Sequence, residues 1–224
     1  MANITVSSSV DSMLKASSAS GIRDAIGSVN YPYTTDFQGG VEATRNLTSI
    51  TSSDGYYFNT SLTSIYVGSN VTSIGDRAFG YCSITEITIP DTVTSLGSYA
   101  FGYCTSLTNV TLSNSITVIE IDTFRACSSL LSVTIPDVVN SIGSYAFYNC
   151  SSLPSVTIGS GVTSIENYVF FQCSSLDTIN CLATTAPTLG SDPFYLTAAT
   201  EIHVPAGATG YGATYGGLTV IDDL

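Results

Sequence analysis

LLSVTIPDVVNSIGSYAFYNCSSL, residues 130–153, is one copy of a unit that recurs along this chain. A unit this short cannot bury its own apolar side chains, so each copy must stack on its neighbours. The sequence therefore predicts a solenoid with a continuous core. Phe and Cys pairs mark the copies at intervals of 22, 23, 23 and 23 residues: Phe79/Cys82, Phe101/Cys104, Phe124/Cys127, Phe147/Cys150 and Phe170/Cys173.

The first part of each copy has the pattern L-x-x-[IV]-x-[IVL], followed by Pro, Gly or Ser. Alternating apolar residues predict a short strand with one buried face, and the breaker ends it. Because successive strands run the same way, we expect a parallel sheet on one side of the solenoid. The strand segments begin at Leu62, Ile84, Leu107, Leu130, Leu153 and Leu176.

The rest of each copy, V-T-S-I-G and then A-F-x-x-C, returns the chain along the other side. Gly75, Gly97 and Gly143 indicate sharp corners, and A-F-x-x-C is interpreted as a single helical turn. The Phe should fill the space between the two sides. In residues 116–124 Glu120 replaces the corner glycine, so a distorted corner is expected there.

The repeat resembles the BspA-like, or Treponema-type, leucine-rich repeat family, and the likeness extends from about Leu62 to the C-terminus. The resemblance implies a leucine-rich-repeat solenoid, α/β to mainly β. It has a short parallel sheet on one side and single helical turns and short strands on the other. "IHVPAGATGYGATYGG" at 202–217 resembles the segment that closes such solenoids. The expected divisions are an N-terminal helical attachment segment (1–30), a linker with a degenerate first repeat (31–61), leucine-rich repeats (62–181) and a C-terminal cap (182–224).

Charge is sparse and one-sided. The formal net charge is −12, and no Lys or Arg follows Arg125. Nucleic acids and anionic lipid surfaces are therefore poor partners. No apolar run is long enough to cross a membrane, so membrane insertion is not expected. The first 21 residues also lack a basic region followed by an apolar stretch, so we expect no export by a secretory signal.

The reactive residues do not form a site for chemistry. Five of the six cysteines hold equivalent positions one rung apart, which predicts buried, reduced thiols without metal. His203 is expected to face solvent, and Asp91 and Asp137 to be solvated loop acids. Without a nucleophile and base pair or a phosphate loop, the chain is predicted to be no enzyme, with no catalytic residue, metal or cofactor.

Two outward surfaces are candidates for binding. A hydroxyl-rich column on the sheet could bind protein or glycan, although Thr also favours strands for structural reasons. Tyrosines near the Phe form the second surface, or else they cover the Phe layer and contact only each other. The candidate residues are Tyr66, Thr88, Thr111, Thr134, Thr157 and Asn180 on the sheet, and Tyr81, Tyr99, Tyr103, Tyr145 and Tyr168 beside the Phe layer.

The segment "VDSMLKASSASGIRDAIGSV" at 10–29 resembles a short motif of bacteriophage tail-fibre and virion appendage proteins. Leu14, Arg23 and Ile26 would attach it to other virion proteins. The resemblance implies a non-enzymatic virion protein, such as a fibre, decoration or receptor-binding protein, that presents the repeats to a host surface protein or glycan. The alternative is a cellular BspA-like adhesin or interaction module outside the cell. A homo-oligomer remains open in both.

Overall fold

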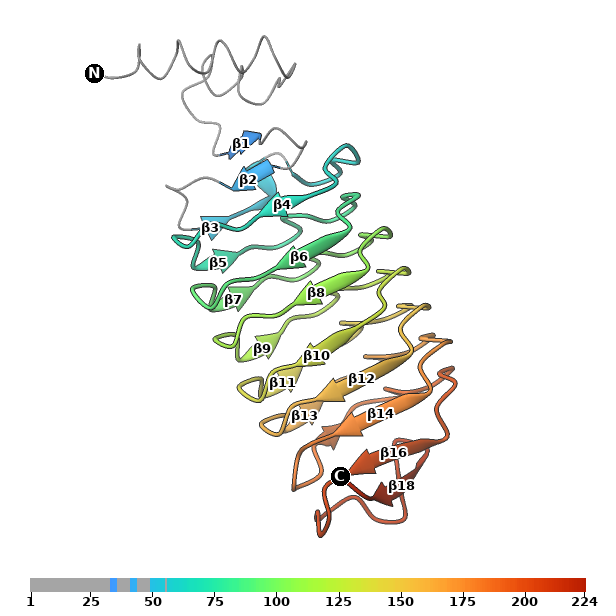
Figure 1. The fold of residues 1–224 in the computed structure, drawn as a ribbon. Coiled ribbons are helices and arrows are strands. Elements are labelled where there is room, and N and C mark those ends of the chain that lie inside the picture. Colours follow the sequence, from blue (N-terminus) through green and yellow to red (C-terminus); the bar gives the residue numbers. More distant parts are fainter. Residues whose placement is uncertain (1–32, 36–40, 44–48, 55) are drawn as a thin grey trace, which may run out of the picture.

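The computed structural model describes residues 33–35, 41–43, 49–54 and 56–224. They form a solenoid whose rungs stack from the N-terminal end to the C-terminal end (Figure 1). The fold class predicted from the repeat is confirmed. The candidate attachment residues Leu14, Arg23 and Ile26 lie outside the described residues, so the virion attachment stays a prediction.

The predicted strands form the parallel ladder on one side. Thr134 pairs with Thr157, and Thr157 pairs with Asn180, so equivalent positions of successive repeats lie side by side. The ladder is not continuous: Glu86–Thr88 and Asn109–Thr111 form a sheet of their own, and an isolated bridge from Asn109 to Ser132 connects it to the strands that follow. The strands from the repeats are β4 (Ile65–Tyr66), β6 (Glu86–Thr88), β8 (Asn109–Thr111), β10 (Val133–Ile135), β12 (Ser155–Ile158) and β14 (Thr178–Cys181).

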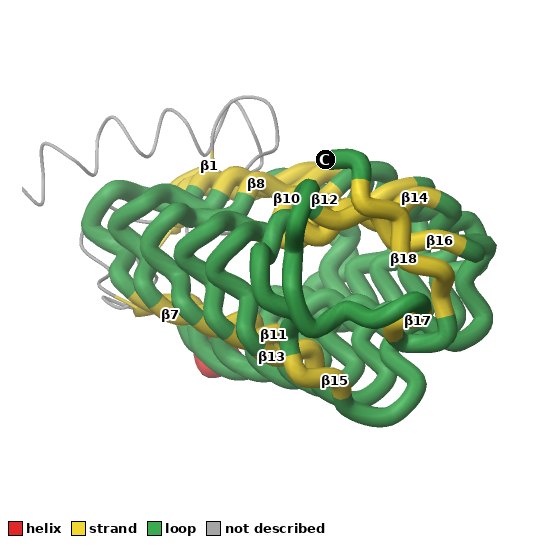
Figure 2. The backbone as a smooth tube through the Cα atoms, turned by 90° about the horizontal axis from the view of Figure 1, so that it is seen from below, coloured by secondary structure: helices red, strands yellow, loops and turns green. Residues whose placement is uncertain are grey.

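Short strands form a second parallel ladder on the opposite side, as the view from below shows (Figure 2). Ser49–Ile50 belongs to this ladder, because it pairs with Ser73–Ile74. The expected degenerate repeat therefore contributes Ser49–Ile50 to this ladder, and Val41–Ala43 pairs in parallel with the first strand of the other ladder. The strands are β3 (Ser49–Ile50), β5 (Ser73–Ile74), β7 (Ser95–Leu96), β9 (Val118–Ile119), β11 (Ser141–Ile142), β13 (Ser164–Ile165) and β15 (Thr188–Leu189).

This ladder divides at the repeat in which Glu120 replaces the corner glycine, although it stays intact where Glu166 does the same. A Cβ on Gly97 would lie 2.3 Å from the Asp76 nitrogen, and one on Gly143 would lie 2.7 Å from the Ile121 nitrogen. These corners require glycine because the preceding rung approaches closely. Glu120 brings a side chain to that position, and the ladder separates there into β3–β5–β7 and β9–β11–β13–β15. The distorted corner expected from the sequence is present.

The A-F-x-x-C segments are turns, so the expected helical turns were wrong. Tyr145 (φ 60°) and Asn149 (φ 56°) flank Phe147 in the left-handed region. The N–H groups of Ala146, Tyr148 and Cys150 bond within the turn, whereas those of Tyr145, Phe147 and Asn149 donate to carbonyls of the next rung. In a helix every N–H would donate to a carbonyl of the same segment, so these hydrogen bonds between rungs would be lost. In the described chain the one helical element is η1 (Ser52–Asp54).

A stack of aromatic rings fills the coil, as predicted. Neighbouring rings from Phe79 to Phe170 have centroids 5.3–5.4 Å apart and are fully buried. Tyr56 extends the stack before Phe79, at 5.2 Å, and Phe194 extends it after Phe170, at 5.9 Å. The stack is therefore longer than the five Phe and Cys pairs indicate.

Both ends carry further strands. β1 (Tyr33–Thr35) pairs antiparallel with β2 (Val41–Ala43), which pairs parallel with β4. At the other end β16 (Glu201–Val204) and β18 (Leu218–Asp222) continue the first sheet in parallel, and β17 (Thr214–Tyr215) pairs antiparallel with β18. The hydroxyls of Tyr211 and Tyr215 donate to the carbonyls of Ala183 and Pro187. The division at residue 182 stays a prediction.

Candidate interaction surfaces

The predicted sheet column lies in register along the first ladder. Tyr66 is 60% exposed, and the hydroxyls that follow it face outward. A groove of about 440 Å³ crosses β4, β6 and β8 and includes Tyr66, Thr88 and Thr111 in its lining. Further along the sheet, Thr134 is exposed, whereas Thr157 and Asn180 are half-buried. That this face binds a partner remains a prediction.

The predicted tyrosines lie on the face formed by the turns. Tyr81 and Tyr103 stack at 4.7 Å, with their planes 2° apart, and Tyr145 and Tyr168 stack at 5.2 Å. Tyr99 lies in the same column as Tyr145, at the left-handed position before the Phe. All five side chains are half-buried, so they both cover the Phe layer and reach the surface.

Sequence reasoning missed the other rings on this face. Phe58 stacks on Tyr81 at 4.2 Å, and Tyr148, Phe171 and Tyr195 form a column of their own. The signal was present, because each of these three directly follows a ring of the buried stack. We call the whole set the aromatic row: Tyr57, Phe58, Tyr81, Tyr99, Tyr103, Tyr145, Tyr148, Tyr168, Phe171 and Tyr195.

Glycines decide which column carries the rings in the first half of the row. A Cβ on Gly80 would lie 2.9 Å from the Tyr57 ring, and one on Gly102 would lie 2.7 Å from the Tyr99 ring. From Arg125 onward the equivalent position carries a large side chain instead. The rung of Phe124 has no surface ring, and Arg125 occupies the gap before the row resumes in the neighbouring column at Tyr148.

Both arginines in the described part of the chain lie on this row. Arg77 lies 5.8 Å from the ring centre of Tyr99, and Arg125 lies 4.5 Å from Tyr148 and 5.3 Å from Tyr145. Cations are attracted to the faces of aromatic rings at such distances. The aromatic row is thus a surface that already accepts guanidinium groups.

Asp122 fixes the Arg125 guanidinium. The Arg125 Nη1 donates to Asp122 Oδ1 at 3.0 Å, and Asp122 is 5% exposed. Burial alone would lower the pKa of Arg125, but its hydrogen bonds to Asp122 and Tyr103 outweigh burial and raise it. Arg125 therefore stays charged between the rings at any pH the protein meets.

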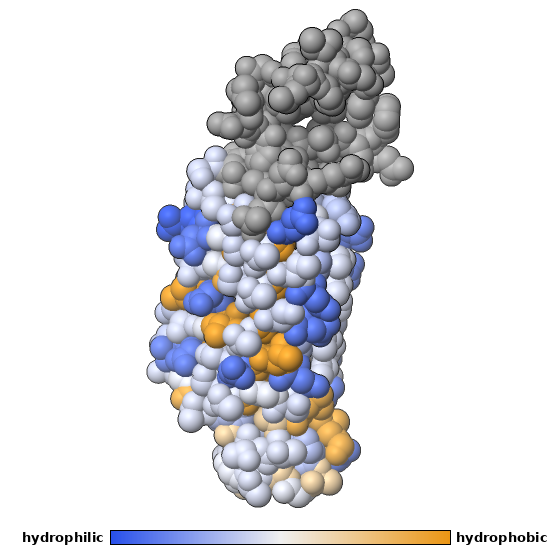
Figure 3. Space-filling view, turned by 90° about the vertical axis from the view of Figure 1, so that its left-hand side faces the viewer, coloured by the Kyte–Doolittle hydropathy of each residue, from blue (hydrophilic) through white to orange (hydrophobic). Residues whose placement is uncertain are grey.

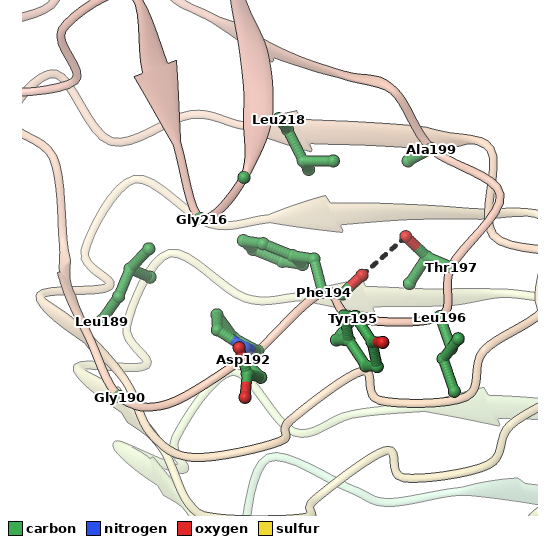
Figure 4. A pocket seen from close by; sticks show the side chains of 12 residues that line it. Leu189, Gly190, Asp192, Phe194, Tyr195, Leu196, Thr197, Ala199, Gly216 and Leu218 are labelled. Atoms are coloured by element: carbon green, nitrogen blue, oxygen red, sulfur yellow. Dashed lines mark hydrogen bonds between the residues drawn. The ribbon is translucent and has the colours of Figure 1, made fainter.

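Two recesses lie at the C-terminal end of the row and share Asp192 and Tyr195. One, of about 390 Å³, is lined by Tyr145, Tyr148, Tyr168, Phe171, Asp192 and Tyr195, and we call it the aromatic groove. The other, of about 400 Å³, lies between the last turn and the β17–β18 hairpin, and we call it the end pocket (Figure 4). Phe194 and Leu218 are buried in its wall.

Apolar side chains also reach the surface near the distorted corner. Val118 (36% exposed) stands where β5, β7, β11 and β13 have Ser, and Ile121 and Val138 are each 42% exposed. On the side of the solenoid shown in Figure 3, apolar residues gather midway along the described part. The sequence departure at Glu120 was the available signal for this patch.

The cysteines, the histidine and the two loop acids considered for chemistry make structural contacts. All six cysteines are buried and free, as predicted. Asp91 and Asp137 are exposed, as expected, and His203 lies on the outer face of its strand between buried Ile202 and Val204, where its Nδ1 also bonds to Asp223 at 2.9 Å. The Asp91 and Asp137 carboxylates each accept a 2.7 Å hydrogen bond from a main-chain N–H of the next rung.

The described residues contain no group of three or more His, Cys, Asp or Glu side chains placed to hold a metal ion. Among these same residues, no helix has the length and apolar character needed to cross a membrane.

Comparison with known families gives a match to the BspA type leucine rich repeat region, in six copies over residues 40–108 and 96–214. Among curated proteins, none matches the chain. The fold is similar to that of a solved leucine-rich repeat protein from Bacteroides ovatus. The two are 24% identical with a TM-score of 0.53, over 81% of this chain and 53% of that one.

Two further solved structures are similar at lower scores. A leucine rich cell surface protein from Faecalibacterium prausnitzii is 24% identical with a TM-score of 0.43, over 81% of this chain and 58% of that one. The leucine-rich repeat protein of T. pallidum is 20% identical with a TM-score of 0.49, over 80% of this chain and 85% of that one. The chain thus spans little more than half the length of the Bacteroides and Faecalibacterium proteins.

Proposed function

Because the chain belongs to the BspA-type leucine-rich repeat family, we propose that it is a non-enzymatic interaction module that works at a bacterial cell surface or outside the cell. Solenoids of this kind commonly bind through one extended face. Its ligand is a protein or glycan of a neighbouring cell or host.

The observation that carries this proposal is the aromatic row. Tyrosine combines a large apolar surface with a polar tip, and it is enriched where proteins meet. The row extends from Tyr57 to Tyr195, with Arg125 in place of a ring in the rung of Phe124, and the turns beneath it are joined by main-chain hydrogen bonds. Rings held on such a rigid base lose little conformational entropy on binding.

The virion interpretation gives way to its cellular alternative. It depends on Leu14 to Gly27, which lie outside the described residues, and the family match begins at residue 40. Neither the family nor the solved structures compared above adds support for a particle-bound role. The cellular module needs only the repeats, which are the matched part.

The test is binding of the fluorescently labelled full chain to a panel of immobilised glycans and extracellular host proteins. Tyr81→Asn with Tyr103→Asn removes two rings, and Asn suits the left-handed backbone because Asn149 holds the equivalent position. We expect a panel member whose affinity falls at least about tenfold, the loss of about 1.4 kcal/mol.

Tyr66→Thr is the matched control, because it removes an exposed ring from the sheet face and gives the residue found at Thr88. Retained binding in this control would support the aromatic row. Loss in the control alone would move the site to the sheet groove, and the absence of any binder would reject the proposal. Protease treatment of intact cells, followed by immunoblotting, tests the surface location.

A further inference from the structure

The aromatic groove has two walls of rings and an acidic end. Tyr145 and Tyr168 stack on one wall, and Tyr148, Phe171 and Tyr195 follow one another on the other. The two columns touch, because Tyr168 and Phe171 meet edge to face at 79° with their centroids 5.5 Å apart. The groove therefore lies over the outer faces and edges of these rings, with Asp192 in its lining.

The same combination of groups already holds a cation elsewhere in the chain. Asp122 and Asp192 occupy equivalent positions, each two residues before a ring of the buried stack and each with a left-handed backbone. Three residues after Asp122 stands Arg125, whereas three residues after Asp192 stands Tyr195. The Arg125 guanidinium lies between Asp122 and the rings of the next rung.

At Asp192 the carboxylate and rings are present without an internal cation. No hydrogen bond or ion pair within the described part of the chain uses the Asp192 carboxylate, which is exposed. Here Tyr168 and Phe171 come from the preceding rung and Tyr195 comes from the rung of Asp192 itself, whereas the rings at Arg125 come from the next rung. After Arg125 the sequence contains seven acidic residues and no Lys or Arg. The field around the groove therefore favours a cation supplied by another molecule.

The end pocket provides an apolar recess next to the aromatic groove. It meets the aromatic groove at Asp192 and Tyr195, and its wall includes Phe194 at 3% and Leu218 at 5% exposure. In Figure 4 the side chains of Phe194, Leu189 and Leu218 surround the pocket, with Asp192, Tyr195 and Leu196 along one side. Two recesses with a common rim suit two neighbouring side chains of one segment, the first basic and the second apolar.

We propose that the C-terminal end of the aromatic row binds a partner protein segment in which an arginine or lysine adjoins a large apolar residue. The basic side chain enters the aromatic groove beside Asp192, and the apolar side chain occupies the end pocket. This inference rests on the proposed function, because it names the class of partner that the module recognises. It also adds Asp192 and Tyr195 to the candidate binding residues.

The experiment is an NMR titration of the full chain, labelled with ¹⁵N, with two dipeptides. One is N-acetyl-arginyl-leucine amide, and the other replaces arginine by citrulline, which keeps the shape and removes the charge. We expect the arginine peptide to shift amide signals of residues 168–171 and 192–199. The citrulline peptide should bind about tenfold more weakly, because it loses the cation–π and ionic contacts.

Three variants complete the test. Asp192→Asn removes the charge and keeps a residue suited to the left-handed backbone, and Tyr195→Leu removes a ring that is 57% exposed. Both should weaken the arginine peptide at least about fivefold. Glu201→Gln removes an exposed charge from the sheet face at the same end and should have no effect. Thermal unfolding of each variant verifies that the fold is retained.

Equal binding of the two peptides would overturn the proposal, as would a loss in Glu201→Gln as large as in Asp192→Asn. Shifts spread over every acidic loop would overturn it as well, since they would show attraction by net charge alone. The proposed function is judged separately. A panel ligand that depends on Tyr81 and Tyr103 but not on Asp192 or Tyr195 would reject this inference and leave the interaction module intact.

Discussion

The thiol of Cys127 donates a hydrogen bond to the carbonyl oxygen of Phe101, the stacked residue of the preceding rung, at 3.2 Å. That carbonyl also accepts the N–H of Cys104 from its own turn. The same thiol bond occurs at all five equivalent cysteines, with lengths of 2.9–3.3 Å. Cysteine thus supplies both apolar volume and a weak donor, which explains why this position is not simply Val or Ala.

Replacing Cys127 should separate these two contributions. Cys127→Ala leaves a small cavity and removes the donor, so we expect a loss of about 1–3 kcal/mol in the free energy of unfolding. Cys127→Ser leaves a similar cavity but keeps a donor, and it should be more stable than the Ala variant by about 1 kcal/mol. Urea denaturation measures both. An Ala variant as stable as the Ser variant would show that the thiol bond contributes nothing.

Alkaline pH should destabilise the fold, because the buried cysteine thiols resist deprotonation in the folded state. Burial raises the pKa of Cys82 and of Cys127 from 9.0 to about 12, and it raises the pKa of Cys104 and Cys150 as well. A raised folded pKa contributes stability that is complete below the unfolded value and is lost as pH rises toward the folded value. The free energy of unfolding should therefore fall between pH 9 and 12.

Urea midpoints measured from pH 7 to 11 test this decline. Cys82→Ser is the control, because a serine hydroxyl does not titrate in this range and the decline should become shallower. A midpoint that stays constant to pH 11 in the natural chain would contradict the expected burial of the thiols.

Corner glycines should be intolerant of a methyl group. Gly143→Ala would place its Cβ 2.7 Å from the Ile121 nitrogen, and the required shift should cost about 1–3 kcal/mol. Glu120→Ala is the matched control at the corner that already carries a side chain, and it should change stability by less than about 0.5 kcal/mol. Thermal or urea unfolding compares them; equal effects would show that the close approach is easily relieved.

Asp137 should contribute to stability against acid. Its Oδ1 accepts the Ser160 N–H at 2.7 Å, and this hydrogen bond lowers the pKa of Asp137 below its ordinary 3.8. A lowered folded pKa gives stability that is present above the unfolded value and is lost as pH falls through the folded value. Asp137→Asn keeps an acceptor without this titration. Urea midpoints from pH 6 to 2.5 should therefore decline less in the variant than in the natural chain.

Much of the solenoid could be predicted because its signals repeat. The spacing of Phe79 to Phe170 defined the rungs, and alternating apolar residues placed the first sheet. The turns could not be predicted in the same way. Tyr145 and Asn149 adopt left-handed backbones because their N–H groups bond the next rung, and tyrosine has no intrinsic preference that would reveal this.

The candidate site was predicted in part for a related reason. Tyr81 and Tyr145 were found because their columns repeat, but the column of Tyr148 and Tyr195 was not, because its positions in the first three Phe and Cys repeats hold glycine and Arg125. A column without rings in these repeats shows no aromatic pattern over most of its length.

The uniform spacing of the buried rings has a consequence for how such a gene changes. Phe101, Phe124, Phe147 and Phe170 follow one another at 5.3 Å, and each rung makes the same main-chain and thiol bonds to its neighbours. Unequal recombination that duplicates one 23-residue unit would insert a rung whose bonding groups find partners above and below. Such an insertion would lengthen the stack by one ring spacing while the strands at both ends stay unchanged.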